Sequence, residues 1–187
     1  MIDTSDFKNG LNIFVDGEPY SILWFQNHKP GKGGAVMRTK LKHLRKGSIV
    51  DKTFKSGEKF DSVDVERRKK QYLYADTESF HFMDQITYDQ IAFPKERMGE
   101  QAGYLKENIE VNAIYLEGEL VTIELPLSVE LKVVSSAPGA KGDTVSSASK
   151  PATVETGIDV AVPLFIKEGD VIKVDTRTGE YLERVQK

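Results

Sequence analysis

The feature that most limits the fold is the regular alternation of short apolar runs with turn residues along nearly the whole chain. Residues 11–15 alternate apolar with polar side chains, and the next two residues, Asp16-Gly17, are typical of a tight hairpin turn. The same succession continues, so that five short strands are expected in about sixty residues. This density of strands and turns predicts a small SH3-like β-barrel over residues 1–63.

Two further sets of strands follow. In the middle third we expect strands at residues 71–75, 79–83, 108–115 and 119–125. In the last third we expect them at residues 129–134, 158–162, 171–175 and 181–185. The pattern therefore predicts an all-β protein with three small β-barrel domains in series, at residues 1–63, 64–127 and 128–187.

Residues 95–107 are the segment with helical spacing. Met98, Ala102 and Leu105 fall on one face, and Pro94 suits the start of a helix. Gly99 and Gly103 each weaken such a helix by about 1 kcal/mol. We therefore expect one short helix in the middle domain. Residues 135–149, rich in serine, alanine and glycine, are expected to form a long loop.

The charge is unevenly distributed along the chain. The net charge of −3 divides into +4 for residues 1–63, −6 for residues 64–127 and −1 for residues 128–187. In the first third, a run of basic residues contains no acid; it comprises Lys29, Lys32, Arg38, Lys40, Lys42, Arg45 and Lys46. The opposite charges of different parts of the chain indicate that the protein binds its partner in one orientation, rather than coating nucleic acid uniformly. The basic run is expected to face phosphates.

A lysine stands between glycines inside this basic run. The segment Lys29-Pro30-Gly31-Lys32-Gly33-Gly34-Ala35 lies between two apolar stretches that are expected to be strands. Glycine accepts backbone conformations that other residues avoid and allows close approach of another molecule. The segment therefore predicts a narrow hairpin that ends in one long cationic side chain. A plain glycine-rich turn with a solvated lysine is the alternative.

This loop resembles the tip loop of the bacterial elongation factor P family. A second, more specific likeness lies near the C-terminus, where the spacing K-x-A-x(4)-G-x(2)-V-x-V-P-x(2)-I-x(2)-G of the family is met by Lys150, Ala152, Gly157, Val160, Val162, Pro163, Ile166 and Gly169. Shorter landmarks, such as Lys52-Thr53-Phe54-Lys55 and Tyr72-Leu73-Tyr74, occur in the family's order. The resemblance covers the whole chain and implies an SH3/KOW-like first domain followed by two OB-like domains.

The resemblance also implies a function and a set of residues for it. Members of the family bind the ribosome beside peptidyl-tRNA and promote peptide-bond formation at consecutive prolines, without being enzymes. By resemblance, Lys32 is the modified tip lysine and the acceptor for a lysine-modifying enzyme. Contacts with tRNA and ribosomal RNA are expected from Arg38, Lys40, Lys42, Arg45 and Lys46. A codon-side loop is expected at Lys141, Gly142, Asp143 and Thr144, and further RNA contacts at Tyr181 and Arg184.

Other chemistry finds little support in the sequence. His28, His43 and His81 are scattered without the spacing of metal ligands, and no phosphate-binding loop of the form G-x-x-x-x-G-K-[ST] occurs. No cofactor and no metal are therefore expected. The absence of cysteine favours the reducing cytoplasm, and no apolar run is long enough to span a bilayer. The protein is expected to be a monomer. Two alternatives remain open: a generic RNA-binding protein with OB and SH3 domains, and an unmodified paralogue of the same family.

The aromatic residues and one further basic cluster have less specific interpretations. The pairs Tyr72/Tyr74 and Phe80/Phe82 alternate on successive strands and are expected to fill a barrel core, with a surface that stacks bases as the alternative. Trp24 is likewise expected to pack. The cluster Arg67-Arg68-Lys69-Lys70 is expected to be a solvated edge, with an RNA-facing edge as the alternative.

Overall fold

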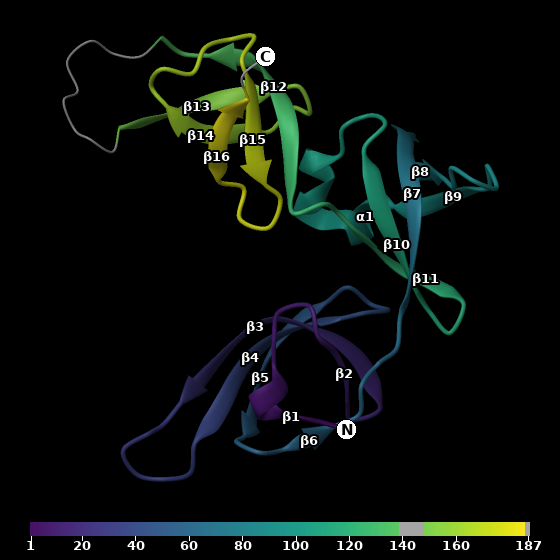
Figure 1. Cartoon of the computed structure of the whole chain (residues 1–187), viewed down its shortest axis with the longest axis vertical. Coiled ribbons are helices and arrows are strands. Elements are labelled where there is room, and N and C mark those ends of the chain that lie inside the picture. Colours follow the sequence, from purple (N-terminus) through teal and green to yellow (C-terminus); the bar gives the residue numbers. More distant parts are fainter. Residues whose placement is uncertain (139–147, 186–187) are drawn as a thin grey trace. The chain divides into compact units, whose positions relative to one another are not determined.

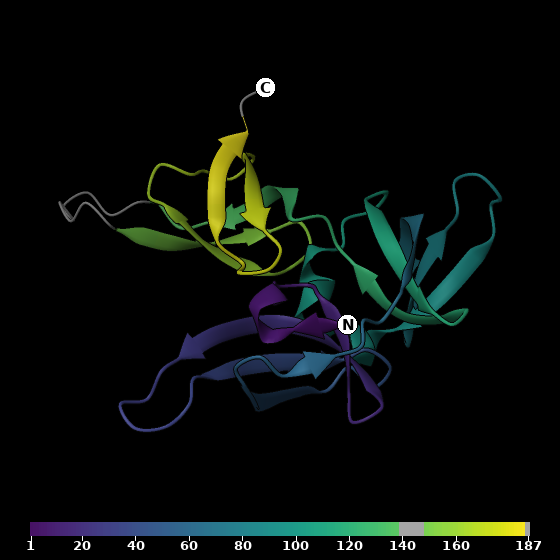
Figure 2. The same cartoon turned by 60° about the horizontal axis from the view of Figure 1, so that its bottom comes forward.

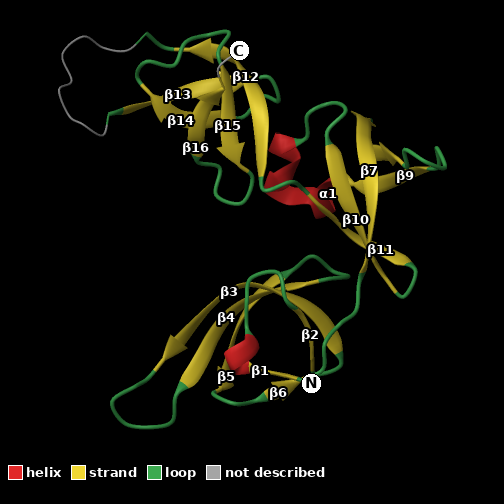
Figure 3. Cartoon of the chain, in the orientation of Figure 1, coloured by secondary structure: helices red, strands yellow, loops and turns green. Residues whose placement is uncertain are grey.

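The computed structural model describes residues 1–138 and 148–185, and it is built almost entirely from short antiparallel strands (Figures 1 and 3). The all-β prediction is confirmed. The chain divides into two compact units, one made of residues 1–67 with 113–122 and the other of residues 68–112 with 123–187. Within the described residues, no helix is long and apolar enough to cross a membrane.

The first unit is built around a four-stranded antiparallel sheet in the order β2-β3-β4-β5. Its strands are β2 (Asn12–Val15), β3 (Glu18–His28), β4 (Val36–His43) and β5 (Ile49–Lys55). Two short strands, β1 (Ile2–Asp3) and β6 (Lys59–Phe60), pair with each other, and a 3₁₀ turn η1 (Thr4–Asp6) follows β1. Alternate side chains point inward and form one core of Phe7, Ile13, Val15, Ile22, Met37, Leu41, Phe54 and Phe60.

The hairpin turns follow the sequence signals closely. Asp16 and Gly17 both have positive φ, at 52° and 79°, as do Glu117 and Gly118, at 51° and 81°. Two consecutive positive φ values are the mark of a two-residue type I′ hairpin, whose twist matches that of the flanking strands. The second of these turns joins β10 (Glu110–Leu116) to β11 (Glu119–Glu124).

The end of the β10–β11 hairpin belongs to the first unit, although it lies far along the sequence. Ile114, Leu116 and Val121 are buried together with Leu44 and Val63 in a small apolar cluster. Burial of these side chains removes apolar surface from water, which ties the hairpin end to the first barrel. A compact unit of this kind does not correspond to a contiguous stretch of sequence.

The middle part of the chain contributes a five-stranded sheet in the order β11-β10-β7-β8-β9. Its other strands are β7 (Glu66–Ala75), β8 (Ser79–Met83) and β9 (Gln90–Pro94). Tyr72, Phe80 and Phe82 are buried as expected, but Tyr74 is 50% exposed. An irregularity in the pairing between Tyr72 and Tyr74 places Tyr74 opposite His81, and the two rings stack at 4.6 Å.

The helix is shorter than the sequence predicts. Helix α1 spans only Lys95–Met98, and a 3₁₀ helix, η2, continues over Gly99–Tyr104 (Figure 3). The break falls at Gly99, whose φ of 61° and ψ of −144° lie outside the α-helical region. Glycine adopts this conformation without steric cost, so the α-helix ends where the sequence first permits it.

The last part of the chain forms a sheet in the order β14-β13-β12-β15-β16. Its strands are β12 (Ser128–Ser136), β13 (Ser149–Val154), β14 (Asp159–Pro163), β15 (Val171–Asp175) and β16 (Tyr181–Val185). Its buried core is wholly aliphatic and includes Leu131, Val133, Val154, Ile166 and Ile172. Among the described residues, β1, β6, β9 and β13 are strands that the sequence did not predict; β1 and β6 are only two residues long.

In the second unit, η2 packs against the last barrel at a position that only glycine fits. A Cβ on Gly103 would lie 2.5 Å from Cγ2 of Ile158, and the hydroxyl of Thr156 donates a hydrogen bond to the Gly103 carbonyl. Gly179 is similarly close to the hydroxyl of Tyr104. These contacts join η2 to the turns between strands of the sheet β14-β13-β12-β15-β16.

We predict that Gly103→Ala lowers the free energy of unfolding by about 1–3 kcal/mol, because the added methyl group forces Ile158 to move. Urea unfolding of the whole chain measures the change. Gly31→Ala is the matched control, since no atom lies within 4 Å of a Cβ at that position. Ile158→Ala should restore much of the loss in the Gly103→Ala background. An unchanged unfolding midpoint for Gly103→Ala would contradict the packing described.

Candidate functional site

The loop between β3 and β4 projects beyond the sheet that carries it, as both views show (Figures 1 and 2). The pairing of the two strands ends at His28 and Val36, and residues 29–35 form the turn. Most of these residues are exposed. Of the three glycines, Gly33 alone has a positive φ, at 117°, so it is the position where the loop requires glycine.

Lys32 lies at this tip with its side chain exposed. It makes no hydrogen bond or ion pair with the residues that the structure describes. The flanking glycines Gly31 and Gly33 carry no side chains that could cover it. A primary amine in this position can contact a phosphate or accept a covalent extension without first breaking an internal interaction.

Basic residues lie behind the loop on one face of β4. The alternation of the strand buries Met37, Thr39 and Leu41 and turns Arg38, Lys40 and Lys42 to the opposite face. The prediction that these three cations share a face is confirmed. Arg38 and Lys40 are exposed and have no ion pair among the described residues, whereas Lys42 is half-buried and has a partner of its own.

The neighbouring strands complete this outer face. Arg38 lies between Gln26 of β3 and Thr53 of β5, and Lys40 lies between Trp24 and Asp51. Among these neighbours of Arg38 and Lys40 on β3 and β5, Asp51 is the acidic residue. We call the surface formed by Trp24, Gln26, Arg38, Lys40, Asp51 and Thr53 the outer face.

Arg45 and Lys46 have a different environment from the cations of the outer face. Nη2 of Arg45 lies 2.8 Å from Oε2 of Glu117, and its Nε lies 3.6 Å from Oε2 of Glu119. Nζ of Lys46 lies 3.7 Å from Oε1 of Glu18. The glutamates that pair with Arg45 come from the β10–β11 turn, far away in the sequence. Both cations therefore have less free charge to offer a ligand than the sequence alone indicates.

His43 holds the turn that carries these two residues. Its ring is buried, its Nδ1 accepts hydrogen bonds from the backbone N–H groups of Arg45 and Lys46, and its Nε2 lies 2.9 Å from Glu18. With Nδ1 acting as an acceptor, Nε2 carries the proton and donates to Glu18. That hydrogen bond, followed by the charge of Lys46, lowers the pKa of Glu18. His43 has a structural role in the basic turn.

Trp24 was expected to be packed and Lys70 to be solvated, and the structure places each in the opposite environment. Trp24 is 45% exposed on the outer face, so the expectation that it packs is wrong. Lys70, expected at a solvated edge, is buried, and its Nζ lies 3.0 Å from Oδ2 of Asp84. Backbone N–H groups of Thr87 and Ile86, together with Lys70, lower the pKa of Asp84. An ion pair in this position satisfies the buried ammonium.

The residues predicted in the last domain are only partly described. Lys141, Gly142, Asp143 and Thr144 lie outside the described residues. Tyr181 is half-buried against the aliphatic core of its own barrel. The guanidinium of Arg184 is exposed and lies 5.5 Å from the ring centre of Phe165 and 3.9 Å from Asp170. Of these two, Arg184 offers the more accessible contact.

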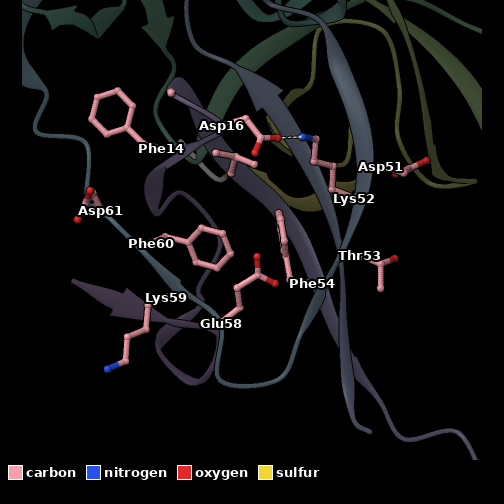
Figure 4. A pocket seen from close by; sticks show the side chains of 12 residues that line it. Phe14, Asp16, Asp51, Lys52, Thr53, Phe54, Glu58, Lys59, Phe60 and Asp61 are labelled. Atoms are coloured by element: carbon pink, nitrogen blue, oxygen red, sulfur yellow. Dashed lines mark hydrogen bonds and ion pairs between the residues drawn. The ribbon is translucent and has the colours of Figure 1, made fainter. Parts of the chain in front are cut away.

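The barrel of the first unit also contains an open pocket (Figure 4). Phe14, Phe54 and Phe60 contribute apolar surface, and Asp16 forms an ion pair of 2.9 Å with Lys52 at its border. Its acids do not converge, and the described part of the chain holds no group of three or more side chains suited to a metal ion. The pocket does not include the tip loop.

Comparisons with known proteins match the whole length of the chain. The model of the elongation factor P KOW-like domain matches residues 3–60, that of the elongation factor P OB domain residues 65–123, and that of the elongation factor P C-terminal region residues 129–184. The first two matches agree with the KOW-like and OB-like folds expected from the sequence.

Individual relatives give the same picture. Elongation factor P of Endomicrobium trichonymphae is 61% identical over 184 residues, which cover 98% of this chain and 100% of the relative. Elongation factor P of Natranaerobius thermophilus is 50% identical over 186 residues, which cover 100% and 99%. A solved structure of eukaryotic translation initiation factor 5A from Methanococcus jannaschii is 25% identical, with a TM-score of 0.46, and covers 66% of this chain and 93% of that one.

We predict that two neighbouring glycines of the tip loop respond differently to alanine. Gly33→Ala should lower the free energy of unfolding by about 1 kcal/mol, because its φ of 117° disfavours a side chain. Gly34→Ala should leave it unchanged or raise it by about 0.5 kcal/mol, since its site is open and alanine restricts the unfolded chain. Urea unfolding of both variants is the measurement, and equal shifts would contradict the described loop conformation.

Proposed function

The chain belongs to the elongation factor P family of translation factors, and from this membership we propose that it binds the ribosome beside peptidyl-tRNA and promotes peptide-bond formation at consecutive prolines. The observation that carries the proposal is the exposed Lys32 at the end of the β3–β4 hairpin, which has no partner among the described residues. Such a hairpin can enter a narrow space and place one amine at its end. The cations behind it on the outer face can hold phosphates at the same time.

The mechanism that we propose is one of orientation. Proline reacts slowly because its ring restricts φ and its nitrogen is a secondary amine. A factor that fixes the acceptor end of peptidyl-tRNA lowers the entropic part of the barrier to peptide-bond formation. In this mechanism Lys32 points to the peptidyl-transferase centre, and the chain donates no catalytic group to the ribosomal reaction.

The rest of the proposal concerns binding and location. Arg38 and Lys40 supply the main phosphate contacts on the tRNA acceptor arm, with smaller contributions from Lys42, Arg45 and Lys46. Ribosomal RNA is contacted from the last domain through Arg184, with Tyr181 as a second contact and residues 141–144 on the codon side. A lysine-modifying enzyme extends Lys32, and the protein acts as a cytoplasmic monomer. The division into domains at residues 1–63, 64–127 and 128–187 belongs to the same proposal.

A generic role in RNA binding is the second candidate function. It is favoured by the exposure of Trp24 and Tyr74, since aromatic rings on an accessible sheet face can stack on bases. Such a protein would not depend on Lys32. The unmodified paralogue is less favoured, because its mark would be an altered tip loop, and this loop keeps the lysine between glycines.

We predict that Lys32→Ala leaves folding intact and abolishes the relief of stalling at consecutive prolines. An exposed lysine without partners contributes little stability, so the thermal midpoint should stay the same. Translation of a reporter that contains consecutive prolines measures the function. Lys8→Ala, which changes another exposed lysine of the same barrel, is the control.

Intact mass spectrometry of the protein from its native host is the companion measurement. A mass increment that maps to Lys32 is expected. Full activity of a well-folded Lys32→Ala protein would rule out the tip assignment and favour generic RNA binding.

We further predict that Arg38→Gln combined with Lys40→Gln weakens ribosome binding and flattens its dependence on salt. Each lost phosphate contact makes the slope of log K against log salt shallower by about 0.7–0.9. The slope of the double variant should therefore be shallower by about 1.5. Lys167→Gln combined with Lys173→Gln is the control, with the same change in net charge. Equal losses from both pairs would mean that the outer face has no special role.

A further inference from the structure

The orientation of Trp24 follows from an irregularity in the pairing of β3 with β4. Ile22 pairs with Leu41, but Trp24 pairs with Lys40, so Leu23 is an extra residue in β3. In a regular strand, residues 22 and 24 would face the same side, and Trp24 would join Ile22 in the core. The extra residue reverses the alternation, which is the usual effect of a β-bulge. Phe25 instead turns inward and packs edge-on against Phe7 at 6.4 Å.

The indole of Trp24 therefore lies among polar and cationic neighbours. Lys40 is directly opposite on β4, and the row of Gln26 and Arg38 is next along the sheet. On the other side of Lys40, on β5, lies Asp51, which is the acidic residue among these cross-strand neighbours. Trp24 makes no ring-to-ring contact with the aromatic residues that the structure describes. A large aromatic surface is left accessible to a ligand.

The combination of residues on the outer face selects one chemical class of ligand. Exposed cations attract phosphates, whether the nucleic acid is single- or double-stranded. An aromatic ring among these cations adds to the affinity only if an unpaired base can stack on it, because the bases of a duplex are already stacked on one another. An apolar protein surface would not need Arg38 and Lys40, which would lose hydration without finding partners. Charge and aromatic character together favour single-stranded RNA.

We propose that Trp24 is a stacking platform for an unpaired RNA base whose flanking phosphates lie on Arg38 and Lys40. The assignment of that base to the single-stranded 3′ end of the tRNA acceptor arm rests on the proposed function. The outer face then positions the end of the acceptor strand by one ring and two charges. The stacking would fix the base in a plane, which phosphate contacts alone cannot do.

The test uses the fact that Trp24 is the chain's sole tryptophan. An RNA hairpin with a short single-stranded 3′ overhang and the same hairpin with a blunt end are each titrated into the full-length protein. The overhang hairpin should quench the tryptophan emission, and the blunt hairpin should leave it nearly unchanged. Labelled hairpins and fluorescence anisotropy then give the affinity of each variant.

Trp24→Ala should weaken binding of the overhang hairpin by about tenfold, which lies within the range measured for base stacking on aromatic side chains. Its affinity for the blunt hairpin and its salt dependence should stay the same. Trp24→Phe should recover part of the loss, since phenylalanine keeps a ring. Arg38→Gln combined with Lys40→Gln should weaken binding of both hairpins.

Equal quenching by both hairpins, or equal affinity of Trp24→Ala and the unaltered protein for the overhang hairpin, would overturn the inference. Quenching by ribosomes but by neither hairpin would show that Trp24 does not take up a free single-stranded 3′ end, and it would also overturn the inference. These results leave the proposed function standing, because that function is tested separately through Lys32 and through ribosome binding of the Arg38 and Lys40 variants.

Discussion

The antiparallel pairing of β3 with β4 is the interaction on which the functional features of this chain depend. It begins in the barrel core, where Ile22 and Leu41 are fully buried, and it continues to His28 and Val36, where the turn projects into solvent. The buried half anchors the hairpin through apolar contacts, and the backbone hydrogen bonds carry that order outward. Lys32 therefore stands on an ordered support, although the tip itself has almost no side-chain contacts.

Sequence patterns predict the parts of this protein that follow local rules. Alternation of apolar residues predicts strands close to those observed, and Asp16-Gly17 forms the turn that its residue types favour. The patterns fail where one extra residue in a strand reverses the face of the sheet to which the following side chains point. Irregular pairing after Ile22 and after Tyr72 turns Trp24 and Tyr74 outward, and nothing in a period of two signals this.

Contacts between distant segments are the other part that could not be predicted. The charge pattern correctly placed Arg38 and Lys40 together, because their relation depends only on strand alternation. It could not show that Arg45 pairs with Glu117 and Glu119, or that Lys70 pairs with Asp84 in a buried position. Such pairs are decided by how strands assemble. A basic run in a sequence therefore overstates the free positive charge of the folded surface.

The isolation of Lys32 has a consequence for any enzyme that acts on it. Lys29 is only three residues away, and it is also exposed and without an ion pair in the described structure. Accessibility cannot distinguish the two amines, and their side chains are chemically identical. What differs is the main chain around them: Lys32 is bordered on both sides by residues without side chains. An enzyme that distinguishes the two amines can therefore do so by fitting closely around the peptide backbone on either side of Lys32, which no side chain covers.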